Sequence, residues 1–171
     1  MRGSEEAVNR IYDSITTVMD EDDRCGATGE WVGLLGFSQG AKLCASILYT
    51  QQYSSEGLGD SSVWPCFRFA VLIAGRAPLV WLDAESAVPA GLVDAAALST
   101  AQHKNLPPTP SASRLQVPTL HVHGLQDPGL RLHRELLHHC CDSTNPRLVE
   151  WEGAHRVPIK PADVTLLAQE I

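Results

Sequence analysis

The segment GFSQG at residues 36–40 places a serine between two glycines, in the pattern G-x-S-x-G. This pattern is typical of a nucleophile elbow when an apolar strand runs into it and a helix runs out of it, because the serine then stands on a sharp turn above the sheet. Both flanks are present, since WVGLLGF precedes the serine and AKLCASILY follows the second glycine. We therefore expect Ser38 to act as a nucleophile. Gly36 and Gly40 are expected to lack side chains so that strand and helix can approach.

A nucleophilic serine needs a base that accepts its proton and a carboxylate that orients the base. In enzymes with this elbow, the acid and the histidine come later in the chain, in that order. The sequence offers Asp127 just past one strand-like run and His155 just past the next. Ser38, Asp127 and His155 are thus the predicted triad. The backbone N–H of Gln39, at the start of the helix, is the predicted donor to the oxyanion that forms during attack on a carbonyl.

Other residues with chemical potential fit this scheme less well. Two further acids, Asp142 and Asp163, respectively follow a helix and begin one, instead of following a strand. We expect five further histidines after residue 120 to be packed or hydrogen-bonded, because neither a carboxylate pairing nor a zinc-ligand spacing accompanies them. These histidines are His121, His123, His133, His138 and His139. The sequence therefore predicts neither a metal nor a cofactor.

The composition narrows the classes of function. Thirteen Lys and Arg against 20 Asp and Glu give a formal charge of −7, which argues against nucleic acid or an anionic membrane as the main partner. No apolar run approaches the roughly 18 residues that span a bilayer, and the N-terminus lacks the hydrophobic stretch of a signal peptide. Five cysteines, with Cys140 and Cys141 adjacent, make a poor disulfide framework. We expect a cytoplasmic protein with reduced thiols, of which Cys44 and Cys66 lie in or near the core.

Four short apolar runs separated by helical patterns predict an α/β fold with a mostly parallel sheet. Such runs are typical of strands buried on both faces, and active sites lie where the carboxyl ends of parallel strands meet. The predicted strands are residues 31–37, 67–74, 117–123 and 148–151, and the predicted helices contain residues 8–19, 39–53, 130–141 and 162–171. Ser4 is the predicted cap of the first helix, and Gly26 is the glycine that follows it.

A long stretch, residues 78–116, separates the second and third predicted strands and contains five prolines. Loops this long in compact domains are usually lids or binding segments. The alternative is an ordered surface excursion with one short helix, and the pattern leaves both open. Leu79, Val80 and Trp81 are predicted to line an apolar acyl pocket.

The segments GLLGFSQGAKLCASILY, FRFAVLIAGRAPL, VPTLHVHGLQDP and LVEWEGAHRVP resemble, in order and spacing, the FSH group of serine hydrolases in the α/β-hydrolase superfamily. The resemblance spans about residues 4–171 and implies one α/β-hydrolase domain over residues 1–171. GFSQGA alone is also shared with acyl-protein thioesterases and carboxylesterases. By this resemblance Ser38 is the nucleophile, Asp127 the acid, His155 the base and Gln39 an oxyanion donor.

Members of this group begin with a strand and an L-H-G-type loop that supplies a second oxyanion N–H, and this chain shows neither. We therefore expect a domain that is incomplete at its N-terminus. Losing one oxyanion donor typically lowers turnover about 10²- to 10³-fold. The strand at residues 31–37 is also expected to become a hydrophobic sheet edge, which a homodimer is one way to cover.

The function that the resemblance implies is hydrolysis of an acyl ester or thioester. Many fungal members that resemble this chain lie in polyketide gene clusters, where they free a finished chain from a carrier protein. We therefore expect release or trimming of a polyketide-type acyl chain, from a small-molecule ester or from a synthase carrier protein. The alternatives are a general carboxylesterase and a weakly active or non-catalytic homologue that binds a partner. A basic face for carrier docking is expected at Arg131, His133, Arg134 and Arg147.

Overall fold

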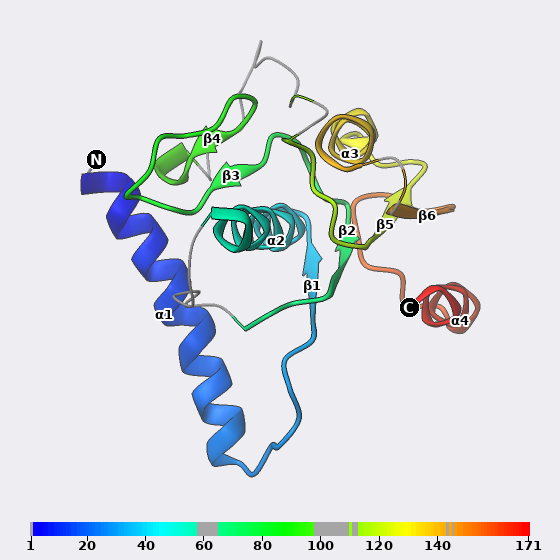
Figure 1. The fold of residues 1–171 in the computed structure, drawn as a ribbon. Helices are drawn as coiled ribbons and strands as arrows, with labels where there is room; N and C mark the ends of the chain where they lie inside the picture. The colour runs from blue at the N-terminus through cyan, green and yellow to red at the C-terminus, as the bar shows by residue number, and fades with distance from the viewer. Residues whose placement is uncertain (1, 58–64, 98–109, 111–112, 143, 145) are drawn as a thin grey trace.

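A computed structural model describes residues 2–57, 65–97, 110, 113–142, 144 and 146–171 (Figure 1). The helices are α1 (Arg2–Arg24), α2 (Gln39–Gly57), α3 (Leu130–Glu135) and α4 (Pro161–Glu170), with a 3-10 turn η1 (Ala95–Ala97) and a π-helical turn η3 (Leu136–Cys140). The strands are β1 (Gly33–Phe37), β2 (Phe69–Ile73), β3 (Val80–Trp81), β4 (Val93–Asp94), β5 (Thr119–Gly124) and β6 (Pro146–Trp151).

The main sheet has four parallel strands in the order β1-β2-β5-β6, which confirms the predicted α/β fold. The two central strands are buried almost throughout, as expected for apolar strands covered on both faces. β1 is an edge of this sheet, and its Leu35 side chain is 68% exposed. The apolar edge expected at residues 31–37 is therefore present among the described residues.

Each face of the sheet packs against different elements. On one face, α2 lies against β1 and β2, and a core cluster extends from α2 to α1, β3 and η3. On the other face, Val71, Ile73, Val122 and Trp151 form a second cluster, to which Leu167 of α4 adds. Figure 1 accordingly shows α4 across the sheet from α2. The carboxyl ends of β1, β5 and β6 are thereby fixed relative to one another.

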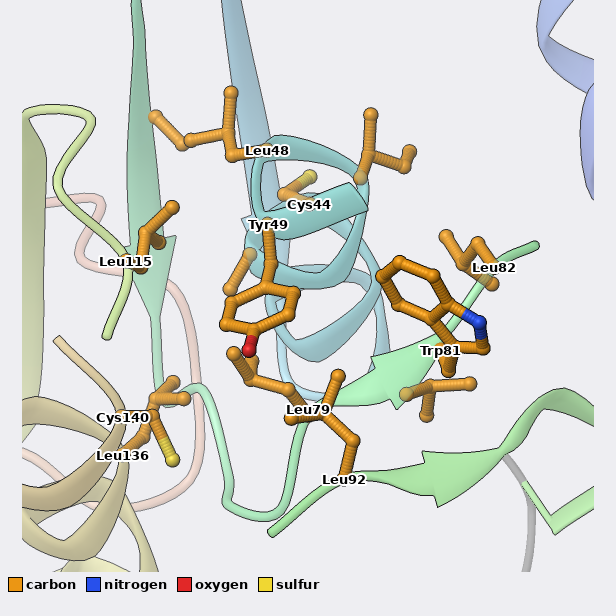
Figure 2. Packing of buried hydrophobic residues seen from close by; sticks show 14 of the residues in the cluster. Cys44, Leu48, Tyr49, Leu79, Trp81, Leu82, Leu92, Leu115, Leu136 and Cys140 are labelled. Carbon is orange, nitrogen blue, oxygen red and sulfur yellow. The ribbon is translucent and has the colours of Figure 1, made fainter. Parts of the chain in front are cut away.

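The segment after β2 packs into the core rather than beside an open pocket. Leu79, Val80 and Trp81 are buried, and Figure 2 shows Leu79 and Trp81 packed around α2 near Tyr49. The Val80 N–H donates to Ser46 Oγ at 2.9 Å, which ties β3 to α2. The prediction that these side chains line an acyl pocket is wrong, because their apolar surface is already covered. Residues 78–97 form an ordered excursion, while 98–109 and 111–112 lie outside the described residues.

The first helix is longer than its apolar pattern indicated. It begins at Arg2, so Ser4 lies inside the helix, where its hydroxyl donates to the carboxylate of Asp94 at 2.7 Å instead of capping its own helix. Gly26 follows the helix with a φ of +95°, the left-handed conformation that glycine adopts at helix ends. The apolar face of α1 packs on the core through Val8 and neighbouring residues of the same helix. No helix in the described ranges has the length and apolarity needed to cross a membrane.

The other departures concern the third helix and one thiol. The helix expected at residues 130–141 divides into α3 and the π-helical turn η3. Cys44 is buried as predicted, and burial raises its pKa to about 11. Cys66 is exposed, so the expectation that it lies in or near the core is wrong.

Two neighbouring histidines on β5, His121 and His123, are buried with their rings 5.9 Å apart. Burial, reinforced by the charges of His123 and His138, lowers the pKa of His121 to about 3. His121 Nε2 lies 3.1 Å from the hydroxyl of Thr119. His121 is therefore neutral in the folded protein at neutral pH.

Lowering the pH below about 6.5 is expected to destabilise the fold, because unfolded His121 takes up a proton that the folded protein excludes. Its contribution to stability is complete above that pH and falls by about 1.4 kcal/mol per pH unit below it. Urea unfolding at several pH values between about 6.5 and 4.5 measures the slope. His121→Gln is expected to have a shallower slope than wild type, whereas the exposed control His139→Gln keeps it. An unchanged slope in His121→Gln contradicts the prediction.

Candidate active site

The turn between β1 and α2 consists of Ser38 alone. β1 ends at Phe37 and α2 begins at Gln39, so strand and helix meet at the serine. Ser38 has a φ of 55°, a left-handed conformation that costs energy for any residue with a side chain. Its backbone N–H donates to the carbonyl of Ile73 on β2 at 2.8 Å, which holds the strained turn against the sheet. The hydroxyl is thereby presented at the carboxyl edge of the sheet.

The two glycines that flank Ser38 differ in whether the surrounding structure leaves room for a side chain. A Cβ at Gly36 would lie 2.5 Å from the backbone of Gly40 and Ala41, closer than real Cβ contacts, so only glycine fits there. A Cβ at Gly40 would meet no atom within 4 Å. The steric reason expected for both glycines therefore holds at Gly36 and is wrong at Gly40.

Ser38, His155 and Asp127 lie in contact although they are far apart in the chain. His155 Nε2 is 2.9 Å from Ser38 Oγ, and His155 Nδ1 is 2.6 Å from Asp127 Oδ2. The imidazole also packs on the ring of Phe37, with ring centroids 5.0 Å apart. With its proton on Nδ1, His155 donates to the carboxylate and leaves Nε2 to accept the serine proton. This is the arrangement that activates a hydroxyl for attack on a carbonyl.

Asp127 is held as an ionised acceptor. It is buried, and its second oxygen, Oδ1, accepts the backbone N–H of Gly129 at 2.7 Å. Burial alone would raise the pKa of Asp127, but the hydrogen bonds from Gly129 and His155 outweigh burial and hold the pKa below its usual value. The rejected acids lie elsewhere: Asp142 follows η3, and Asp163 is in the first turn of α4.

The loops that carry Asp127 and His155 touch each other closely. A Cβ at Gly124, the last residue of β5, would lie 2.4 Å from the carbonyl oxygen of Gly153 and 2.7 Å from that of Ala154. Sequence reasoning did not single out Gly124, because its importance comes from a neighbouring loop rather than from the local pattern. The contact fixes the separation between the segments before Asp127 and His155.

His133 is a second residue whose place beside Asp127 the sequence analysis missed, since the pattern put it among the packed histidines and in the basic face. Its ring is fully buried on α3, with Nε2 3.7 Å from Asp127 Oδ2 and its ring centroid 6.3 Å from that of His155. Burial lowers the pKa of His133 to about 4, and the positive charge of Arg76 acts in the same direction, against the attraction of Asp127. His133 lies six residues after Asp127 in the chain, and this short separation was the signal that the sequence offered.

The residues expected to form a basic face for carrier docking do not present unpaired positive charge to the solvent. Each of its three arginines is ion-paired with a glutamate, and its histidine is the buried His133. The pairs are Arg131–Glu135, Arg134–Glu150 at 2.9 Å and Arg147–Glu170 at 3.5 Å. The expectation is wrong, because a neighbouring glutamate carboxylate balances the positive charge of each of the three guanidinium groups.

Comparison with known proteins agrees with this geometry. A family model described as serine hydrolase (FSH1) matches residues 1–165. Esterase dbaE of Emericella nidulans is 54% identical over 177 residues, which cover 99% of this chain and 64% of dbaE. Esterase citA of Monascus ruber is 48% identical over 167 residues, which cover 98% of this chain and 62% of citA. The chain thus spans less than two thirds of the length of these relatives.

Among solved structures, RedJ with a PEG molecule bound in its active site superposes with a TM-score of 0.53 at 16% identity. The superposition covers 95% of this chain and 68% of RedJ, and it shows a shared fold. The family model matches nearly the whole chain, including the elbow, the acid loop and the histidine loop. The chain belongs to the serine hydrolase (FSH1) family.

Proposed function

We propose that this protein is a serine hydrolase that cleaves an acyl ester or thioester through an acyl-serine intermediate. The continuous contact from Ser38 through His155 to Asp127 is the observation that carries the proposal. The family supports it, as do the esterase names of relatives such as dbaE and citA.

The first half of the reaction forms the acyl-serine. Ser38 Oγ attacks the carbonyl carbon while its proton moves to His155 Nε2. The carbonyl oxygen becomes an oxyanion, and the proposed donor to it is the N–H of Gln39, the first residue of α2. The tetrahedral intermediate then collapses, and His155 gives its proton to the departing alcohol or thiol.

The second half releases the acid. A water molecule gives a proton to His155 Nε2 and its oxygen attacks the acyl-serine carbonyl. Collapse of the second intermediate returns the proton to Ser38 and frees the carboxylic acid. In both halves the ionised Asp127 carboxylate accepts the hydrogen bond from His155 Nδ1–H and stabilises the imidazolium while it exists, and its lowered pKa keeps it ionised across the neutral range.

The substrate is proposed to be a polyketide-type acyl chain of secondary metabolism, carried by a small-molecule ester or by a synthase carrier protein. The resemblance to fungal members of the family supports this substrate. The exposed Leu35 on edge strand β1 supports a homodimer that covers this edge. All five cysteines are free thiols, which supports a reducing compartment such as the cytoplasm.

A fluorophosphonate probe and p-nitrophenyl butyrate test the activity together. Wild type is expected to be labelled at Ser38 and to hydrolyse the ester, and Ser38→Ala is expected to lose labelling and about 10⁴-fold or more of turnover. Ser14→Ala, which removes an exposed hydroxyl on α1, is the matched control and keeps both. Folded wild type without label, or labelling that survives in Ser38→Ala, overturns the proposal. A butyryl thioester assayed beside the ester shows which leaving group is preferred.

A further inference from the structure

Three side chains beside the serine form a group with the composition of a zinc site. Asp127, His133 and His155 each present one ligand atom, and the three atoms lie within 4.8 Å of one another. Two imidazoles and a carboxylate are donors that Zn²⁺ binds in proteins. The side chains of Asp127 and His133 are fully buried, while that of His155 is one-third exposed.

His133 is not part of the proposed triad, and the hydrogen bonding of its buried ring is unusual. Neither of its ring nitrogens makes a hydrogen bond to any described residue, although the ring is fully buried. A buried polar group without a partner is uncommon and calls for a specific explanation. Nε2 faces the carboxylate oxygen of Asp127 at 3.7 Å, and His123 covers the other side with ring centroids 5.6 Å apart.

The spacing of the donors suits a tetrahedral ion. Zinc bonds of about 2.0–2.1 Å place neighbouring ligand atoms about 3.3 Å apart. The two distances to Asp127 Oδ2, 2.6 Å from His155 Nδ1 and 3.7 Å from His133 Nε2, lie on either side of that value. All three ligand atoms lie within 4.8 Å of one another, so side-chain shifts of about 1–1.5 Å bring them to bonding positions around one ion.

We propose that Zn²⁺ binds to Asp127, His133 and His155 as a reversible inhibitor. The binding part stands on the geometry alone, and the inhibition part rests on the proposed function. Zinc on Nδ1 of His155 takes the lone pair of that nitrogen, so the ring proton moves from Nδ1 to Nε2. A protonated Nε2 does not accept the proton of Ser38, and the zinc ion replaces the hydrogen bond between Asp127 and His155.

The binding test uses Co²⁺, whose visible absorption reports tetrahedral coordination, and is made in Ser38→Ala. This variant keeps all three ligands and needs no activity. Exposed thiols also bind such metals, so Cys25→Ser and Cys66→Ser are included in the background. One Co²⁺ per chain, displaced by Zn²⁺, is expected. Adding His133→Phe is expected to weaken binding by more than about 100-fold, beyond the effect typical of losing a residue that only supports a ligand.

Controls separate this site from surface histidines and from misfolding. His138→Gln with His139→Gln removes the exposed histidine pair and is expected to keep Co²⁺ binding. His133→Gln, closer to the native side chain, is measured beside His133→Phe, and circular dichroism verifies the fold of each. Folded Ser38→Ala without tetrahedral Co²⁺, or unchanged binding in both folded His133 variants, overturns the proposal.

The activity test uses the wild-type sequence. Excess Zn²⁺ is expected to lower p-nitrophenyl butyrate hydrolysis at least tenfold, EDTA to restore it, and Mg²⁺ to have no effect, since Mg²⁺ prefers oxygen ligands. Co²⁺ binding without any hydrolase activity refutes the proposed function and leaves the zinc site intact. Hydrolysis that Zn²⁺ does not inhibit refutes the inhibitory role.

Discussion

Asp127→Asn is expected to lower kcat for ester hydrolysis by about 10⁴-fold while the protein stays folded. The asparagine carbonyl still accepts the N–H of Gly129, so the turn after β5 keeps its hydrogen bond. The asparagine amide group, however, donates a proton where the carboxylate accepted one. His155 then accepts at Nδ1 and carries its proton on Nε2, where it faces Ser38 Oγ and blocks proton transfer.

The measurement compares steady-state hydrolysis of p-nitrophenyl butyrate by Asp127→Asn with that by Asp142→Asn. Asp142 is the competing acid of the sequence analysis and lies after η3, so its replacement is expected to change kcat less than twofold. Fluorophosphonate labelling of Ser38 is expected to slow in parallel with kcat in Asp127→Asn. A fall of less than tenfold in the folded variant would show that Asp127 does not orient the base.

The parallel sheet and the convergence of three residues were predictable because each rests on a strong local signal. Apolar runs such as residues 67–74 mark strands buried on both faces, and parallel strands bring their carboxyl ends to one edge. Residues that follow such strands are then neighbours, whatever their separation in the chain. Ser38, Asp127 and His155 each follow a strand of the main sheet, and the structure brings them into hydrogen-bond contact.

The features that sequence reasoning missed depend on partners from distant segments. Ser4 looked like a helix cap because its own helix was read alone, whereas its hydroxyl is used by Asp94, 90 positions away. Trp81 was expected to contact a ligand, but its ring packs against residues of α2, which lies far from it in the sequence. The arginines of the expected basic face are ion-paired with glutamates, one of which, Glu150, lies on β6. Local patterns contain no information about such neighbours.

Gly124→Ala is expected to lower kcat/KM by about 10²-fold or more, although Gly124 touches no reacting atom. The added methyl group would lie 2.4 Å from the carbonyl oxygen of Gly153 and 2.7 Å from that of Ala154. Both are backbone atoms, so no side chain can rotate away and the loop before His155 has to move. A displacement of about 1 Å at a catalytic group typically costs about 10²-fold in rate, because proton transfer needs Nε2 within hydrogen-bond reach of Ser38.

Gly29→Ala provides the matched comparison, because a Cβ at Gly29 meets no atom within 4 Å and its φ lies outside the left-handed region. It is expected to leave kcat/KM and the urea midpoint near wild-type values. In Gly124→Ala the fall in kcat/KM should exceed any loss of folded protein, measured by circular dichroism on the same sample. Full activity in folded Gly124→Ala would mean that the loop accommodates the methyl group without moving His155. The close contact between the two loops would then be a packing feature with no role in placing the base.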